Sequence, residues 1–285
     1  MAILFDGDDY LNKDLGGTGP ISSYPVTLSA WIKPNSLGSS EMNYDFQDFV
    51  ISDGSNTARI GLGAARYGRW GLYTKSNKAP TGSSFSENWS RTSANSWANV
   101  VGVFTAANAR TGYVNGSGNT WSGGSNQVQT LSDADIIGVG SGSSTGSSNA
   151  LSKNTVAECA LWNVALTATE IDCLAAGFSP LLIRPESLLG YWPLGGAYPD
   201  YSDQVGGNAL SATGGPASSS HPPIIHPSIP VVVKESTAEP VTADGSVSEY
   251  ARTPDTSGSF TKPYDTSSTY SRDTDTTGTF TRPSE

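Results

Sequence analysis

The residues that could form a nucleophilic active site do not fall into a working arrangement. Gly142, Ser144 and Gly146 fit the G-x-S-x-G pattern of serine hydrolases, but that pattern requires a strand before the serine and a helix after it. Here it lies within a run of serine and glycine, which predicts a loop. The two histidines, His221 and His226, lie among prolines much later in the chain. The sequence therefore argues against a serine hydrolase.

The sequence also offers no recognisable site for a nucleotide or a nucleic acid. Gly61 and Gly63 begin a G-x-G pattern, but Arg66 stands where the dinucleotide-binding fingerprint needs a third glycine. No strand–helix–strand pattern surrounds these glycines. The formal net charge is −10, and a chain with this excess of acidic groups repels the phosphate backbone of nucleic acids. We therefore expect no nucleic-acid partner.

Neither a membrane span nor a disulfide framework is expected. No apolar run approaches the roughly 20 residues that a membrane-spanning helix requires. Met1 is followed by AILFDGDDY, which lacks the basic region and the cleavage site of a secretion signal. The two cysteines, Cys159 and Cys173, can by themselves form neither a set of disulfides nor a zinc site. Both are expected to be free thiols.

Any site must be positioned by short strands, because the composition disfavours long helices. The 285 residues include 32 glycines, and charged residues make up only 15%. The stretch WANVVGVFTAANARTGYVNG, residues 97–116, contains two short apolar runs separated by a polar segment. Consecutive apolar residues are typical of a strand that is covered on both faces, and Asn115-Gly116 is typical of a tight turn. This stretch predicts a central hairpin.

Similar short runs occur along most of the chain up to residue 194. Residues 3–10 predict a first strand that runs into an acidic turn. We expect further strands at residues 26–34, 49–52, 58–64, 69–74, 136–139, 156–162 and 188–194, and long polar loops at 35–48 and 75–96. One helix is predicted after Thr167, which forms a capping-box pattern with Glu170 and precedes Ile171 and Leu174. The pattern predicts an all-β fold: a two-sheet antiparallel jelly-roll sandwich with one short helix.

Four sequence blocks in a fixed order resemble a known family. The blocks are FDGDDYL, VTLSAWIKP, SWANVVGVF with YVNG, and VAECALWNVALTATEI. Together they resemble the laminin-G-like, concanavalin A-like jelly roll over residues 1–178. In that family a Y-W-P-L segment commonly precedes the first block, whereas here similar text follows the helix at residues 190–215. The resemblance therefore implies a circularly permuted domain over residues 1–215, with Tyr191–Leu194 beside the first strand.

The resemblance also implies that a Ca²⁺ ion could bind at the rim of the sandwich. Members of the family often hold one Ca²⁺ there through aspartate side chains and backbone carbonyls. The aspartates in predicted turns are Asp8, Asp9, Asp53, Asp200 and Asp203, and each could contribute oxygen atoms. Acidic residues in turns are also common as solvated caps, so both interpretations stay open and the sequence selects no ligand set.

Sugar binding is the second property that the resemblance implies. The aromatic residues on predicted loops are Tyr44, Phe46, Phe85, Trp89 and Trp121. Aromatic rings in such positions can stack on the faces of sugars. They can equally well anchor long loops to the core, because large rings bury much apolar area. The loop aromatics are therefore carbohydrate candidates, with core packing as the alternative.

The enzymatic motif of the family is incomplete in this chain. The glucanases of this fold class carry two glutamates and one aspartate as E-x-D-x-x-E on one strand face. The nearest match begins at Glu170 and Asp172, but Ala175 stands at the position of the second glutamate. The match also lies on the predicted helix. We therefore expect no enzymatic activity.

Beyond the jelly roll the composition changes twice. Residues 216–248 are rich in proline and predict an extended linker. Residues 249–285 repeat with a period of ten, which predicts short strands separated by Asp-Thr turns. One phase of this extended repeat tail is aromatic and the phase two residues later is basic: Tyr250, Arg252, Phe260, Lys262, Tyr270, Arg272, Phe280 and Arg282. A disordered low-complexity tail is the alternative.

The repeat predicts attachment to another chain. One decapeptide unit carries a single aromatic ring, and its burial cannot offset the entropy lost in ordering ten residues. The tail must therefore be ordered by a partner or by further copies of this chain, for example in a trimer. We expect the aromatic residues to enter pockets and the basic residues to lie near carboxylates.

These observations together favour a structural protein of a virus particle. The run IRPESLLGYWPLGG at residues 183–196 is also similar to text in tailed-phage virion proteins. On this hypothesis the protein is made in the host cytoplasm, is displayed at the virion surface as a capsid decoration, and contacts other virion proteins through residues 216–285. The alternatives are a carbohydrate-binding adhesion or receptor-binding module and, less favoured, a glycan-active enzyme.

Overall fold

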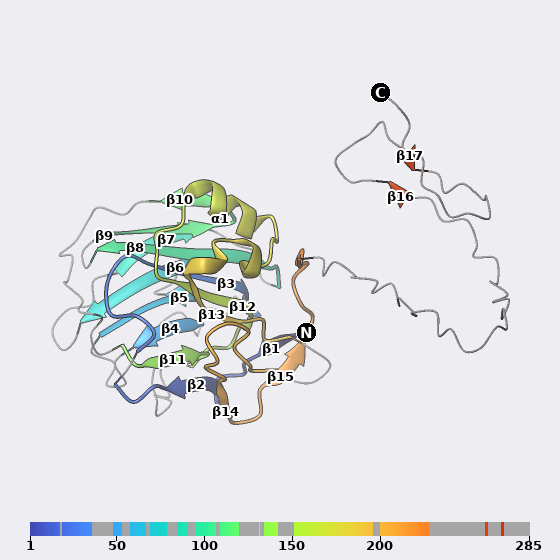
Figure 1. The fold of residues 1–285 in the computed structure, drawn as a ribbon. Coiled ribbons are helices and arrows are strands. Elements are labelled where there is room, and N and C mark those ends of the chain that lie inside the picture. The colour runs from blue at the N-terminus through green and yellow to red at the C-terminus, as the bar shows by residue number, and fades with distance from the viewer. Residues whose placement is uncertain are drawn as a thin grey trace, which may run out of the picture. The chain divides into compact units, whose positions relative to one another are not determined.

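The computed structural model describes residues 1–17, 19–35, 48–52, 58–66, 69–78, 85–90, 95–106, 109–119, 131, 134–141, 151–195 and 200–227, and two short strands within residues 260–270. The chain divides into two units, Met1–Ile229 and Pro230–Glu285. The first unit contains a β-sandwich (Figure 1). In the described part of the chain, no helix is long and apolar enough to cross a membrane.

The larger sheet lies on the side of the sandwich that carries the helix. In spatial order it contains β10 (Ser117–Asn119), β9 (Ala109–Val114), β8 (Ala98–Ala106), β3 (Val26–Lys33), β12 (Thr155–Trp162), β1 (Ala2–Leu4) and β15 (Ala217–Ser219). A further strand, β13 (Leu188–Trp192), also pairs with β12. All of these pairings are antiparallel.

The second sheet faces the first across the core. Its spatial order is β14 (Ser211–Thr213), β2 (Tyr10–Asp14), β11 (Ile136–Val139), β4 (Phe49–Ser52), β5 (Ala58–Arg66), β6 (Arg69–Lys78) and β7 (Phe85–Ser90). These strands are antiparallel as well. The predicted all-β, two-sheet antiparallel sandwich with one short helix is therefore confirmed.

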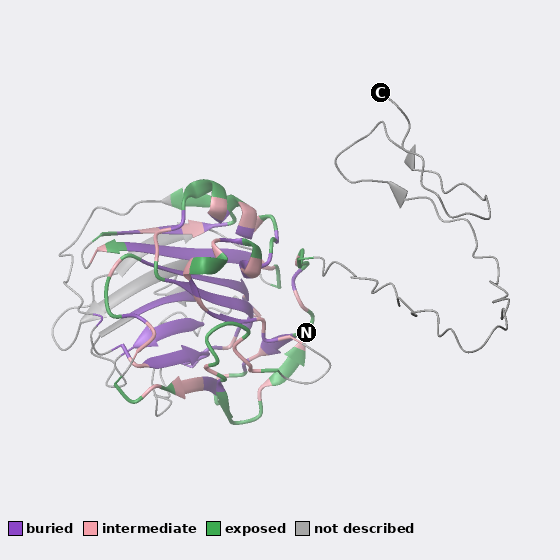
Figure 2. Ribbon diagram, viewed as in Figure 1, coloured by how far each residue is buried: buried purple, intermediate pink, exposed green. Residues whose placement is uncertain are grey.

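The central hairpin consists of β8 and β9, as residues 97–116 predict. Val100 and Phe104 of β8 belong to the core between the two sheets. Val101 and Val103 lie on the opposite face of the same strand, where they pack with Ile171 of the helix. Figure 2 shows most of β8 and of the adjacent β3 buried. Both faces of β8 are covered, which explains why its apolar residues are consecutive.

The helix α1 (Ala168–Ala175) begins where the capping-box pattern places it. The side-chain oxygen of Thr167 accepts a hydrogen bond from the Glu170 N–H, and the Glu170 carboxylate accepts one from the Thr167 N–H. Ile171 and Leu174 are buried against the outer face of the larger sheet. Two short 3₁₀ helices, η1 (Pro180–Leu182) and η2 (Pro185–Ser187), follow.

The first strand and the acidic turn predicted at residues 3–10 are both present, and the turn leads into a second strand. β1 ends at Leu4 in the larger sheet, and β2 begins at Tyr10 in the second sheet. The chain crosses between the sheets through a turn at residues 6–9. Gly7 has a φ of +104° in this turn, a conformation that glycine adopts without the steric cost of a side chain.

The loop predicted at residues 75–96 is also partly wrong. β6 continues to Lys78, and β7 occupies Phe85–Ser90 at the edge of the second sheet. The sequence of this region is rich in serine and asparagine and lacks clear alternation. The pairing of β7 with β6 supplies the backbone hydrogen bonds that stabilise such a polar strand.

The segment after the helix is integral to the sandwich. β1 and β13 pair with successive parts of the same edge of β12. Trp192 and Leu194 lie in one core cluster with Ile3 and Phe5, so the Tyr191–Leu194 segment packs beside the first strand. The first unit also continues beyond residue 215, because β15 pairs with the other edge of β1.

Candidate functional site

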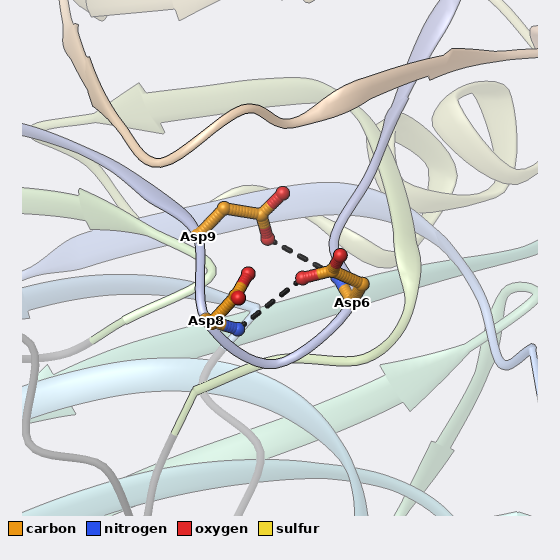
Figure 3. Close-up of side chains that lie close together, drawn as sticks. All are labelled: Asp6, Asp8 and Asp9. Carbon is orange, nitrogen blue, oxygen red and sulfur yellow. Dashed lines mark hydrogen bonds between the residues drawn. The ribbon is translucent and has the colours of Figure 1, made fainter.

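Three carboxylates meet in the turn that crosses from β1 to β2. Figure 3 shows Asp6, Asp8 and Asp9 around this turn. Their ligand oxygen atoms all lie within 4.8 Å of one another. The Asp8 N–H donates to Asp6 Oδ1 (3.3 Å), and the Asp6 N–H donates to Asp9 Oδ1 (3.1 Å). The backbone of the turn therefore fixes two of the three carboxylates.

The acidic turn presents two carboxylates to solvent and buries the third. Asp6 and Asp8 are exposed, whereas Asp9 is only 1% exposed. Gly214 approaches Asp9 so closely that a side chain at residue 214 would collide with it. The segment that contains β14 thus covers Asp9 and leaves Asp6 and Asp8 accessible.

Mutual repulsion in the acidic turn alters the protonation of its carboxylates. A hydrogen bond between the carboxyl groups of Asp6 and Asp8 lowers the pKa of Asp6. The same bond, together with the charge of Asp6, raises the pKa of Asp8. Burial raises the pKa of Asp9. Carboxylates that hold a proton because like charges crowd together gain from a bound cation.

A buried polar network fixes the chain beside the acidic turn. Asp48 is fully buried, and its carboxylate accepts hydrogen bonds from Ser152 Oγ and from Asn154 Nδ2. The Phe5 N–H donates to the Asn154 carbonyl oxygen (3.0 Å). These contacts hold Lys153 against Gly7, where a side chain larger than hydrogen would collide with it. The acidic turn is therefore built on a rigid base.

The donor set fits a hard divalent cation such as Ca²⁺. Calcium binds six to eight oxygen atoms, preferably from carboxylates and carbonyls. Asp6, Asp8 and Asp9 each offer one carboxylate oxygen to a common point within a short stretch of chain. The nearby cation, Lys153, lowers the pKa of Asp6 only through its charge. Asp6, Asp8 and Asp9 are the residues that would hold the ion.

The sequence identified only part of this group. The structure brings Asp8 and Asp9 together, as candidate ligands, and adds Asp6, which sequence reasoning missed. The signal is present as D-x-D-D in FDGDDY, which the sequence predicts as an acidic turn, but only Asp8 and Asp9 of it are predicted as ligands. Asp6 joins them because the turn connects β1 and β2, which belong to different sheets.

The other aspartates that were candidates for calcium lie elsewhere. Asp203 accepts hydrogen bonds from the N–H groups of Tyr191, Val205 and Asn208, so its carboxylate orders its own loop. Asp200 is exposed and accepts a bond from the Ser202 N–H. Asp53 lies outside the described residues.

The aromatic carbohydrate candidates are not gathered into a described surface. Phe85 and Trp89 lie on β7 and not on a loop, which corrects the sequence prediction for both residues. Tyr44, Phe46 and Trp121 lie outside the described residues. Of the five candidates, the structure therefore places Phe85 and Trp89, both on the edge strand β7.

The C-terminal unit contains one described pair of strands. β16 (Phe260–Thr261) pairs antiparallel with β17 (Thr269–Tyr270), and Phe260 lies opposite Tyr270. These two aromatic residues hold the same position in successive ten-residue repeats, so one pair of equivalent residues meets across the two strands. The remaining tail candidates fall outside the described residues: Tyr250, Arg252, Lys262, Arg272, Phe280 and Arg282.

Solved structures with a similar fold include carbohydrate-binding proteins and a laminin. A Bacteroides ovatus protein named for carbohydrate binding has a TM-score of 0.51 and 19% identity, covering 75% of this chain and 58% of that chain. Domain 4 of AbnA, an arabinanase from Geobacillus stearothermophilus solved with arabinotriose, has a TM-score of 0.47 and 17% identity, covering 61% of this chain and 76% of that chain. The LG4-5 domains of the mouse laminin α1 chain have a TM-score of 0.39 and 12% identity, covering 59% of this chain and 43% of that chain.

These likenesses concern the fold alone, because all three identities are below 20%. No curated protein sequence matches the chain. A family model, however, matches residues 5–172, which is more than half of the chain and includes the acidic turn and most of α1. The chain therefore belongs to the concanavalin A-like lectin/glucanases superfamily.

Proposed function

We propose that the sandwich is a non-catalytic carbohydrate-binding module whose binding depends on Ca²⁺ at the acidic turn. The observation that carries this proposal is the cluster of Asp6, Asp8 and Asp9 at the rim, with their oxygens within 4.8 Å of one another. Membership of a superfamily of lectins and glucanases supports the choice of ligand class. A bound Ca²⁺ would offer coordination positions that sugar hydroxyl oxygens can fill.

The placement of the chain's acid and base groups supports binding in place of catalysis. Glu170, from the incomplete glucanase motif, lies on α1, where its carboxylate bonds to Thr167 and to Arg184. This carboxylate is engaged in holding the helix start and is not aimed at a strand face. A glycosidase needs two free carboxyl groups across the scissile bond. The Glu170 motif therefore favours a structural role.

Calorimetric titration with CaCl₂ tests the metal part of the proposal. Asp6→Asn removes one of three carboxylates, so its Ca²⁺ affinity is expected to fall at least about tenfold, or about 1.4 kcal/mol. Asp14→Asn is the matched control, because Asp14 is also exposed and its carboxylate also accepts a backbone N–H two residues later. Equal affinity in the two variants, or no heat of binding at millimolar Ca²⁺, would contradict a site at the acidic turn.

A glycan array probed with the full chain tests the ligand class. We expect glycans to be retained in Ca²⁺ and released when EDTA is added, since the metal lies at the proposed binding rim. If the Ca²⁺-loaded protein binds no glycan, the result contradicts carbohydrate binding but does not contradict the metal site. Release of reducing sugar from a bound glycan would reject the non-catalytic assignment.

A second function, attachment to a virus particle, is favoured by the tail. Phe260 lies opposite Tyr270 in the β16–β17 pair, so equivalent residues of successive repeats meet across one ladder. We propose that the repeat displays its aromatic and basic residues to other virion proteins, with residues 216–285 as the attachment segment. The sandwich would then be a decoration displayed on a phage particle, with several copies associated through their tails.

Deletion of residues 249–285 tests attachment independently of the sandwich. The truncated protein is expected to keep its sandwich, because this part of the chain lies in a separate unit, and to lose its place on purified particles. The measurement is the copy number per particle, with the circular dichroism of both proteins as the check on folding. A truncated chain that joins particles at full occupancy would place attachment in the sandwich.

A further inference from the structure

Residues 217–227, here called the strap, connect the sandwich to the tail. Within the strap, β15 pairs with β1. Ile224 packs against Trp31 on the outer face of the larger sheet. The Ile225 N–H donates to the Gly177 carbonyl oxygen (2.7 Å), which ties the strap to the end of the helix region. The strap therefore covers the part of the outer face that α1 leaves open.

The strap places His221 among hydrogen-bond acceptors. Nδ1 lies 2.9 Å from the carbonyl oxygen of Pro222. Nε2 lies 3.2 Å from Oε1 of Glu158 and 3.3 Å from the carbonyl oxygen of Pro193. A neutral imidazole carries a single N–H, so one ring nitrogen would face an oxygen without a proton between them. Only the imidazolium donates on both sides, so this geometry favours protonated His221.

The partner of His221 is a buried carboxylate in a strained position. Glu158 is 1% exposed and lies at a bulge in β12, where its φ is +56°. This left-handed conformation is unfavourable for residues other than glycine. Its Oε2 accepts a hydrogen bond from the Tyr191 hydroxyl (2.7 Å). Its Oε1 is buried and accepts no hydrogen bond in the described residues, and the His221 ring, 3.2 Å away, is the group that can pair with its charge.

We propose that His221 and Glu158 form a pH-responsive clasp that holds the strap on the sandwich and loosens it when His221 loses its proton. A buried carboxylate without a paired cation is unstable, so the docked strap compensates the charge of Glu158. Loosening the strap uncovers Trp31 and frees the segment that leads into the tail. The clasp thus makes the base of the tail sensitive to pH.

Several groups around the ring determine its protonation. Burial by itself lowers the pKa of His221, but the Glu158 carboxylate and the carbonyls of Pro222 and Pro193 outweigh it, so the pKa is raised above its ordinary value. Burial, and then the charge of Glu158, raise the pKa of Tyr191. Tyr191 therefore stays a neutral hydrogen-bond donor.

Three further groups lie beside the clasp. The Cys159 thiol stays neutral, because burial raises its pKa well above the ordinary value. The Lys33 ammonium donates to the side chains of Ser219 and Ser220 in the strap (3.3 and 3.4 Å). The Met1 amino nitrogen faces Gly195 from the same side as Nε2 of His221. Of these neighbours, His221 is the group that contacts the Glu158 carboxylate.

The direction of the pH effect follows from the raised pKa. The docked strap binds more protons than the released strap at pH values between the two pKa values of His221. Docking of the strap is therefore strongest at pH values below the ordinary histidine pKa of about 6.5. It weakens as the pH rises through the raised pKa that His221 has in the docked strap. Each unit of difference between the two values changes the docking equilibrium constant about tenfold.

Hydrogen exchange of the full chain between pH 5.5 and 9 tests the clasp. After correction for the chemical exchange rate at each pH, amides of the strap, such as that of Ile225, are expected to lose protection as the pH rises. NMR of the two histidines, His221 and His226, is expected to give His221 a midpoint above about 6.5. His226→Gln assigns the two imidazole signals.

Two matched variants decide the outcome. His221→Gln keeps one N–H donor without a titratable charge, so its strap should exchange faster than the wild-type strap at pH 6 and show no pH step. His226→Gln, which changes an exposed histidine of the same strap, should behave as the wild type does. A His221 midpoint at or below about 6.5, or equal protection in wild type and His221→Gln at all pH values, would overturn the proposal.

Discussion

Replacing Trp192 by alanine is expected to destabilise the sandwich by about 3–5 kcal/mol, the range for removing a large aromatic ring from a core. Trp192 is fully buried, and its ring packs on that of Phe49 with centroids 6.0 Å apart at 59°. Phe49 belongs to the second sheet and Trp192 to the larger one. The pair therefore joins the two sheets across the core.

Two further contacts fix the Trp192 ring in place. The indole Nε1–H donates to the carbonyl oxygen of Asn208 (2.8 Å). A side chain on Gly190 would collide with the six-membered ring of Trp192, so the ring lies directly over the backbone of its own strand. Alanine at residue 192 leaves both a cavity and an unpaired carbonyl oxygen at Asn208.

Urea unfolding followed by circular dichroism measures this loss. Trp192→Phe is the control, because phenylalanine keeps an aromatic ring at this position while it removes the donor to Asn208 and a smaller part of the buried volume than alanine does. The decrease in the free energy of unfolding for Trp192→Phe should be less than half of the decrease for Trp192→Ala. A loss below about 1 kcal/mol for alanine would show that β13 is peripheral to the fold.

Replacing Asp203 by alanine is expected to be the second largest effect, about 2–3 kcal/mol. Oδ1 accepts the N–H groups of Tyr191 (2.9 Å) and Val205 (3.0 Å), and Oδ2 accepts the N–H of Asn208 (3.1 Å). Hydrogen bonds to a charged acceptor are the stronger kind. Because one donor is in β13, the carboxylate joins the loop to the sheet. Its removal unpairs three backbone donors together.

The control for Asp203 lies three residues earlier. Asp200 is also in the loop, but it is exposed, and its carboxylate accepts the N–H of Ser202. Asp200→Ala is therefore expected to change the free energy of unfolding by less than about 0.5 kcal/mol. The same urea titration compares the two variants. Equal losses at both positions would contradict a structural role for Asp203.

The acidic turn and the clasp respond to pH in opposite directions. Ca²⁺ binding needs deprotonated carboxylates, and the raised pKa of Asp8 means that acid displaces the ion. Protonation of His221 instead secures the strap as the pH falls. The Asp6→Asn and His221→Gln variants separate the two effects.

The sequence by itself determined the elements whose information is local. The capping box of Thr167 and Glu170 fixes the start of α1 because all of its hydrogen bonds lie within four residues. The consecutive apolar residues of β8 indicate that both of its faces are buried. The order of the four sequence blocks along the chain identified the superfamily. Such signals can be read from neighbouring residues alone.

Tertiary structure decided the features that depend on contacts between distant segments. β7 is polar and was predicted as loop, because the hydrogen bonds that stabilise it come from β6 in the sheet. The acidic turn formed only because β1 and β2 pair in different sheets. The pairing of His221 with Glu158 requires the strap to return across β12, and no local pattern marks either residue. A carboxylate and an imidazole far apart in sequence acquire their chemistry from the burial that only the fold imposes.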